Sequence, residues 1–126
     1  MNRDGANIAR RRRAHESGIS AEDAVAQLLR QRGWSILAQR WRAEAGEIDL
    51  IVEHEARLRF VEVKLRQADD PVGLECIDDR KLARLRGAGE QFLADWPHEI
   101  AEACLLVALV EPLGDSFDIQ LFDDPD

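Results

Sequence analysis

Two short apolar runs that carry acidic residues constrain the fold of this chain more than any other feature. Residues 46–52 read GEIDLIV, and residues 58–64 read LRFVEVK. Both runs are rich in β-branched and aliphatic residues, which favour strands. The stretch between them, residues 53–57, is charged and typical of a loop. The pattern therefore predicts a β-hairpin.

Charged side chains of this hairpin share strand faces with apolar ones, because side chains alternate between the two faces of a strand. On the first strand, alternation predicts two opposed sets: Ile48, Leu50 and Val52 against Glu47, Asp49 and Ile51. On the second strand, Glu62 and Lys64 share a face with Leu58 and Phe60, opposite Val61 and Val63. Burying an unpaired charge is costly, so these groups need partners or a metal ion.

The charges leave two interpretations open. One is a set of internal salt bridges, for example Lys64 with Glu62 or Asp49, because structural ion pairs produce the same pattern. The other is a divalent-metal site. Mg²⁺ binds through one or two carboxylates together with waters and phosphate oxygens, and Asp49 and Glu62 can supply the carboxylates. The backbone carbonyl of Val63 is then a candidate third ligand, and Lys64 lies beside a metal-bound water.

The order of these residues resembles a nuclease signature. Asp49 followed by Glu62, Val63 and Lys64 resembles the PD-(D/E)xK pattern of restriction-endonuclease-like nucleases. The longer strings GEIDLIV and FVEVKLR are similar to those of the YraN-type family of uncharacterised bacterial proteins, which are predicted to be endonucleases related to Holliday-junction resolvases. The resemblance extends from about residue 18 to residue 110.

The resemblance implies a function and a cofactor for the hairpin. It implies a restriction-endonuclease-like α/β fold that hydrolyses phosphodiester bonds in DNA, with Mg²⁺ or Mn²⁺ held by Asp49 and Glu62. Lys64 would orient the attacking water or neutralise charge that develops on the phosphate. Glu47 is a supporting acid, placed near the ligands or paired with Lys64.

Further site residues come from the same resemblance, and each has a simpler alternative. Glu22 matches a helix carboxylate that contributes to the metal site in related nucleases, but an acid in the first turn of a helix is also favoured by the helix dipole. Arg66 matches a basic residue that follows the lysine, and Lys81 matches a lysine on a helix. Both are candidates to bind nucleic acid, and both also fit a solvated surface.

Two segments of the chain differ from the usual sequence of the family. Arg40 and Arg42 flank a tryptophan, which suits contact with a nucleic acid, although such a tryptophan more often covers the edge of a core. The family usually has Asn at position 40. It also commonly shows an Arg-Phe-Asp string near the strand at 104–110, where this chain has Leu105 to Val107.

Length and composition describe one globular domain. The chain has 126 residues, 45% hydrophobic and 33% charged. We expect a basic, disordered arm over residues 1–15, one nuclease-like domain over 16–122 and an acidic tail over 123–126. No apolar run approaches the length of about 20 residues that spans a membrane, and the start lacks the apolar core of a signal peptide, so we expect a cytoplasmic protein with no membrane partner. The two cysteines are isolated, which predicts neither a disulfide framework nor a zinc site.

The charge is unevenly distributed along the chain. The net charge is -8, which is unfavourable for a protein that binds nucleic acid. Residues 1–45, however, contain nine arginines and five acids, a net charge of +4, whereas residues 46–126 carry a net charge of -12. The four adjacent arginines at 10–13 could contact a phosphate backbone without sequence specificity.

The remaining elements follow from periodicity and capping residues. The expected order is α-β-β-β-α-β-β, a mixed sheet flanked by helices, with an exposed loop over 67–77. Besides the hairpin, the expected elements are helices at 20–32 and 79–96 and strands at 34–41, 104–110 and 117–122.

Three functions are compatible with these observations. The favoured one is a metal-dependent endonuclease acting on DNA rather than RNA, with branched or junction DNA as one substrate class. The second is a nuclease-like fold that binds nucleic acid without catalysis or needs a partner to act. The third is a scaffold protein whose buried charges are structural ion pairs. The sequence leaves the oligomeric state open, with a homodimer as one option.

Overall fold

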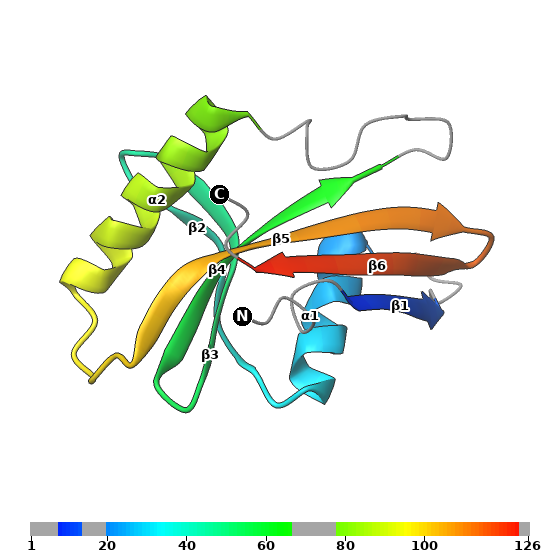
Figure 1. The fold of residues 1–126 in the computed structure, drawn as a ribbon, viewed down its shortest axis with the longest axis horizontal. Coiled ribbons are helices and arrows are strands. Elements are labelled where there is room, and N and C mark those ends of the chain that lie inside the picture. The colour runs from blue at the N-terminus through cyan, green and yellow to red at the C-terminus, as the bar shows by residue number, and fades with distance from the viewer. Residues whose placement is uncertain (1–7, 14–19, 67–77, 124–126) are drawn as a thin grey trace.

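The described residues fold as a six-stranded mixed sheet with one helix on each face (Figure 1). The computed structural model describes residues 8–13, 20–66 and 78–123, with the backbone alone for residues 8–13. The strand order across the sheet is β1-β6-β5-β4-β3-β2. The elements in chain order are β1 (Ile8–Arg13), α1 (Ala21–Gln31), β2 (Ser35–Arg42), β3 (Glu47–His54), β4 (Arg57–Leu65), α2 (Asp79–Ala94), β5 (Glu102–Leu113) and β6 (Ser116–Asp123). The α/β class and the expected order of seven elements are confirmed.

Strand β1 is an additional element that the sequence pattern did not predict. Residues 8–13 belong to the segment expected to be an arm, and they pair antiparallel with β6, from Ile8 opposite Leu121 to Arg13 opposite Ser116. The four adjacent arginines lie in this strand. The rest of the expected arm up to residue 15, the expected loop at 67–77, the tail at 124–126 and Cys76 lie outside the described residues.

Both helices begin at the capping residues that the sequence indicated. The Ser20 hydroxyl accepts a hydrogen bond from the Asp23 amide at 3.2 Å, and the Asp78 carboxylate accepts one from the Lys81 amide at 2.9 Å. Such caps satisfy amide groups that have no partner inside the helix. The second helix ends at Ala94, two residues earlier than predicted. None of the helices in the described segments is long and apolar enough to cross a membrane.

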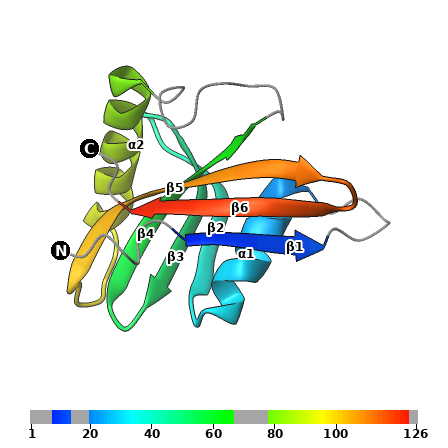
Figure 2. The ribbon, with the colours of Figure 1, turned by 45° about the vertical axis from the view of Figure 1, so that its right-hand side comes forward.

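The two helices divide the core into two clusters, one on each face of the sheet (Figures 1 and 2). On one face, α1 packs Val25 and Leu29 against the sheet, and on the other α2 packs Leu82 and Leu85. Strands β4 and β5 are parallel. A parallel pair needs a long crossover connection, which α2 supplies here. The central strand β5 is buried from Leu105 to Val110, as its continuous aliphatic run predicted.

The alternation predicted for the hairpin holds on β4 and fails at one residue of β3. On β4, Leu58 and Phe60 lie in the cluster under α2, whereas Val61 lies in the cluster under α1. On β3, Leu50 lies in the cluster under α1, but Ile48 lies in the cluster under α2 with Ile51. The prediction that Ile48 shares a face with Leu50 was therefore wrong. The regular pairing of β3 with β4 begins only at Leu50, so before that residue β3 is paired with β2 alone.

The hairpin turn is shorter than the five-residue loop expected from the sequence. His54 pairs with Arg57, which leaves only Glu55 and Ala56 in the turn. Both have positive φ, at 53° and 66°. Two-residue hairpin turns with positive φ at both positions usually contain Asn or Gly, so this turn lacked its ordinary sequence signal.

Two glycines of α2 allow the helix to approach the sheet closely. A Cβ atom at Gly89 would lie 2.9 Å from the Phe60 ring, and one at Gly87 would lie 2.9 Å from the Ala45 Cβ. A larger residue at either position would therefore require these neighbours to move.

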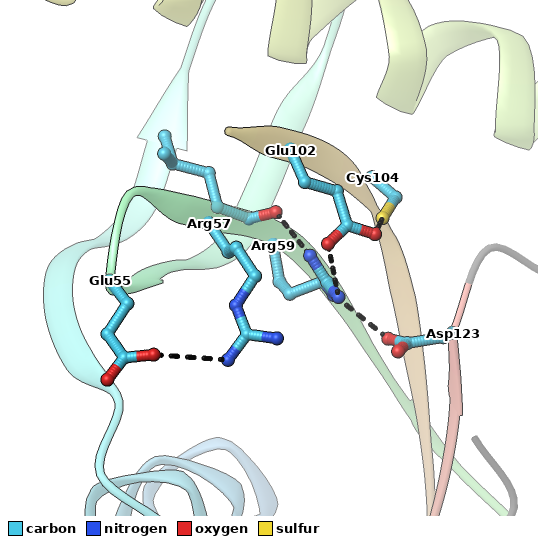
Figure 3. A network of polar contacts seen from close by, with 7 residues as sticks. Glu55, Arg57, Arg59, Glu102, Cys104 and Asp123 are labelled. Carbon is cyan, nitrogen blue, oxygen red and sulfur yellow. Dashed lines mark hydrogen bonds and ion pairs between the residues drawn. The ribbon is translucent and has the colours of Figure 1, made fainter. Parts of the chain in front are cut away.

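A buried arginine joins three strands at one end of the sheet (Figure 3). Arg59 of β4 is 5% exposed; its Nε donates to Asp123 of β6 at 3.1 Å, and its Nη2 lies 3.6 Å from Glu102 of β5. Its guanidinium also lies over the Trp34 ring, 5.3 Å from the centroid. Cys104 lies beside this network as a free thiol, and burial raises its pKa to about 11. Cys104 is therefore protonated at neutral pH.

Candidate metal and phosphodiester site

The candidate site forms where β3 and β4 stop pairing. The last paired residues are Leu50 of β3 and Val61 of β4. One residue before Leu50, the Asp49 carboxylate accepts a hydrogen bond from the Val63 amide at 2.8 Å. A side chain thus replaces the missing backbone partner and holds the two strand ends together.

The opposite edge of β3 is also irregular at Asp49. Gln39 and Trp41 of β2 pair with Leu50 and Ile48, so Arg40 lies opposite Asp49 by register. Arg40 has a φ of 53°, a left-handed conformation that is uncommon for a residue other than glycine. Such strain is common at functional sites, where the surrounding structure holds it in place.

Asp49 and Glu62, the two carboxylates of the nuclease-like pattern, line one small cavity. Its volume is about 120 Å³, and it lies between the end of the hairpin and the first half of α2. Its lining residues are Gly46, Glu47, Asp49, Glu62, Lys81, Arg84 and Leu85. The cavity therefore combines three acids from the sheet with two cationic side chains from the helix.

Glu62 is buried and paired with a lysine from α2. Its side chain is 8% exposed, and its Oε2 lies 3.1 Å from the Lys81 Nζ. Lys81 was expected to bind nucleic acid, and here it neutralises the most buried acid of the site. An ion pair was one of the two interpretations left open by the sequence, but with Lys64 as the partner.

Asp49 has an elevated pKa. Burial raises its pKa from 3.8 to about 6, and the negative charges of Glu62 and Glu22 add to this effect. The hydrogen bond from Val63 and the positive charge of Lys81 act in the opposite direction. A carboxyl group crowded by other acids in this way is a typical feature of a functional site.

Glu22 lies near the pair and is held by a different cation. It belongs to the first turn of α1, and its Oε1 accepts a hydrogen bond from the Arg40 Nε at 3.1 Å. The effect of Glu22 on the Asp49 pKa shows that the two acids lie within electrostatic range of each other. Arg40, expected to contact nucleic acid, pairs with an acid in this structure.

The other predicted site residues lie around the cavity. Glu47 lines it and forms an exposed ion pair with Arg42 at 3.6 Å. Lys64 lies on β4 two residues beyond Glu62, partly buried, and does not line the cavity. Arg66 follows the end of β4, where its backbone amide donates to the Val110 carbonyl at 2.8 Å.

Trp41 belongs to the core and not to an exposed stacking surface. It packs against the cluster under α2, with its ring edge-on to Phe92 at 5.3 Å. The interpretation of Trp41 as a residue that covers the core edge is the one that the structure supports.

The donor atoms of the cavity have the chemistry that a hard divalent cation requires. Asp49 and Glu62 offer carboxylate oxygens, the ligand type of Mg²⁺ and Mn²⁺. The ion pair with Lys81 shows that a positive charge can lie beside the Glu62 carboxylate. Within the described segments, no three His, Cys, Asp or Glu side chains converge on one point, so a metal ion would complete its coordination with backbone oxygen or water.

Comparison with known proteins places the chain in a family. The family model described as uncharacterised protein family UPF0102 matches residues 21–120. The chain belongs to the UPF0102 family. This is the YraN family, so the resemblance of the hairpin motifs is confirmed.

Relatives in UPF0102 span most of this chain. A UPF0102 protein of Synechococcus sp. is 43% identical over 97 residues, 75% of this chain and 74% of the relative. One of Prochlorococcus marinus is 39% identical over 101 residues, 79% of this chain and 80% of the relative. One of Cereibacter sphaeroides is 35% identical over 102 residues, 80% of this chain and 86% of the relative. The residues that match the family model thus include α1, the hairpin and α2, which together contain the candidate site.

Two contributors to the UPF0102 site were missed by sequence reasoning. Arg84 lines the cavity beside Lys81, one helical turn later, and was not among the candidate site residues. The spacing of three residues was the available signal, because residues three apart share a helix face. Gly46 was the other: a Cβ there would lie 3.4 Å from the Arg84 Cβ, so glycine lets the hairpin and α2 approach closely.

Proposed function

We propose that this UPF0102 protein is a metal-dependent endonuclease that hydrolyses phosphodiester bonds in DNA. One observation carries the proposal: Asp49 and Glu62 line the same cavity where their strands separate, with Lys81 and Arg84 of α2 opposite them. Carboxylates able to bind a cation thus lie next to cationic side chains able to bind phosphate. The resemblance of Asp49, Glu62 and Lys64 to the PD-(D/E)xK pattern supports the same conclusion.

Each residue of the site has its own proposed role in such a reaction. Asp49 and Glu62 would hold Mg²⁺ or Mn²⁺, with the Val63 carbonyl as a candidate additional ligand. The metal, when bound, would polarise the phosphate and lower the pKa of a coordinated water. Lys64 would orient the attacking water or neutralise charge on the phosphate, and Glu47 would support the ligands. Arg66, Lys81, Arg40 and Arg42 would bind the nucleic-acid backbone.

Cleavage of a panel of DNA substrates tests this proposal. The full chain is incubated with Mn²⁺ or Mg²⁺ and with labelled junction, flap, single-stranded and duplex DNA. We expect cleavage of at least one substrate, and its loss in Glu62→Ala and in Lys64→Ala. Glu90→Ala, an exposed acid of α2 outside this cavity, is the matched control and should cleave as the wild type does. Activity that persists in both site variants would overturn the assignment.

A second candidate function is nucleic-acid binding without catalysis, or with a partner that completes the site. Two observations favour it: Lys64 does not line the cavity, and Glu62 is occupied by Lys81. Binding of labelled DNA without cleavage of any substrate in the panel would support this second function over the first.

A further inference from the structure

Two acids near Asp49 are paired with cations from separate elements. Glu62 on β4 contacts Lys81 of α2, and Glu22 on α1 contacts Arg40 of β2. Both distances are 3.1 Å. Glu62 and Glu22 are thus each paired with a cation in this structure.

The two cationic groups differ from their acids in exposure. The Glu62 side chain is 8% exposed and that of Lys81 is 44% exposed. The Glu22 side chain is 25% exposed and that of Arg40 is 69% exposed. Each cation is therefore more accessible to a nucleic-acid backbone than the acid with which it pairs.

Arg40 is held in its position at a conformational cost. Its φ of 53° is unfavourable for an arginine, and its ion pair with Glu22 lies at this irregular point of β2. Asn adopts left-handed conformations more readily, so replacing Arg40 with Asn removes the cation while suiting the backbone.

We propose that Lys81 and Arg40 are positioning residues that neutralise Glu62 and Glu22 until a divalent cation binds, and that they then transfer to DNA phosphates. This inference rests on the proposed metal-dependent function. A divalent cation at the carboxylates would repel both cationic groups and take over their role as counter-charges. Because the Lys81 and Arg40 side chains are 44% and 69% exposed, a phosphate can reach each of them from the solvent. Binding of metal and binding of DNA would therefore strengthen each other.

Metal affinity without DNA is the first test. Mn²⁺ is titrated into the full chain by calorimetry, with Lys81→Gln compared against Arg84→Gln. Arg84 lines the same cavity but forms no ion pair with an acid in the part of the chain that the structure describes, so the control removes an equal charge. We expect Lys81→Gln to raise Mn²⁺ affinity about threefold to tenfold more than Arg84→Gln, because the ion pair with Glu62 no longer competes with the metal. Arg40→Asn should raise affinity more than Arg42→Gln does.

The salt dependence of DNA binding is the second test, and a purely structural ion pair would not change it. A fluorescein-labelled duplex is titrated with protein at several salt concentrations, with and without Ca²⁺, and recovered intact DNA is verified on a gel. Each phosphate contact adds about 0.9 to the slope of log affinity against log salt. We expect Ca²⁺ to steepen the slope of the wild type, and to steepen that of Lys81→Gln by about 0.9 less. Arg84→Gln should change the slope equally with and without Ca²⁺.

The outcomes separate this inference from the proposed function. If the wild type shows no saturable Mn²⁺ site, both the exchange and the metal-dependent function are overturned. If the wild type binds Mn²⁺ but Lys81→Gln and Arg84→Gln behave alike in both tests, the exchange alone is overturned. Tighter Mn²⁺ binding together with the reduced Ca²⁺-dependent slope in Lys81→Gln supports the exchange.

Discussion

The Asp49 carboxylate accepts a hydrogen bond from the Val63 amide at 2.8 Å, immediately beyond the last paired residues of β3 and β4. One side chain thus both holds the strand ends together and forms a wall of the cavity that contains Glu62. The site and the end of the hairpin therefore depend on the same residue.

The two roles of Asp49 can be separated by substitution. Asp49→Asn keeps a side-chain oxygen that can accept from Val63, whereas Asp49→Ala leaves that amide without its acceptor. We expect the free energy of unfolding of the Ala variant to be about 1 kcal/mol lower than that of the Asn variant, the typical contribution of one hydrogen bond. Urea denaturation of both variants measures this difference. Equal stabilities would show that the bond contributes nothing to the fold.

The elevated pKa of Asp49 predicts how stability changes with pH. The pKa of Asp49 is about 6 in the folded protein, whereas the ordinary pKa of this group is 3.8. The contribution of this group to the free energy of unfolding is therefore fully present below pH 3.8 and is lost as the pH rises through about 6. Asp49→Asn lacks this titration, so its stability relative to the wild type should rise as the pH increases from about 3.8 to about 6 and stay level above that range.

NMR titration of the Asp49 carboxyl carbon measures the same effect directly. We expect a midpoint at about 6. Glu62→Gln should lower this midpoint, because it removes a negative charge that disfavours ionisation of Asp49. A midpoint that stays unchanged in Glu62→Gln would contradict the electrostatic coupling of the two acids.

The hairpin and the acidic pair could be predicted from sequence because both depend on local patterns. Asp49 and Glu62 are charged residues within apolar strands, and the family resemblance indicated that both belong to one site. The pairing of Lys81 with Glu62 could not be predicted, because it depends on how α2 packs across the sheet. That packing is set by two glycines whose neighbours, Phe60 and Ala45, are distant in sequence.

Outside the candidate site, we expect substitution of Arg59 to have the largest effect on stability. Its guanidinium contacts Asp123 and Glu102 and lies over Trp34, so Arg59→Ala removes both charge pairing and packing. We expect the free energy of unfolding to fall by about 2 kcal/mol, since both acids are partly exposed and can be solvated by water. Arg59→Met keeps most of the apolar stem and should lose less. Thermal and urea denaturation measure both variants, and an Ala variant as stable as the wild type would refute this role.

The hairpin turn offers a stabilising change. Glu55 and Ala56 both have positive φ, at 53° and 66°, which costs energy for residues other than glycine or asparagine. The double variant Glu55→Asn, Ala56→Gly has the residues preferred in this turn and should raise the free energy of unfolding by about 1 kcal/mol. Gly114→Ala, at another positive φ of 59°, is the matched opposite change and should lower it. A destabilised double variant would show that the turn is not strained.

The two features that sequence analysis placed incorrectly are Ile48 and strand β1, and both errors have the same physical cause. Ile48 departs from strict alternation because β3 is not paired with β4 before Leu50. Strand β1 was missed because its arginine-rich sequence lacks the apolar alternation by which strands are recognised. In both cases, the conformation depends on whether a neighbouring strand pairs at that point, and no local pattern in the sequence reports such pairing.

Calorimetric titration of Mn²⁺ into the full chain, with Asp49→Asn and Glu62→Gln as variants, tests the central claim most directly. If Asp49 and Glu62 form a metal site, the wild type binds Mn²⁺ saturably, and each variant loses that binding while its circular dichroism spectrum stays unchanged. Absence of a saturable site in the wild type, or equal binding in folded variants, would contradict the account and leave the acids as structural ion-pair partners.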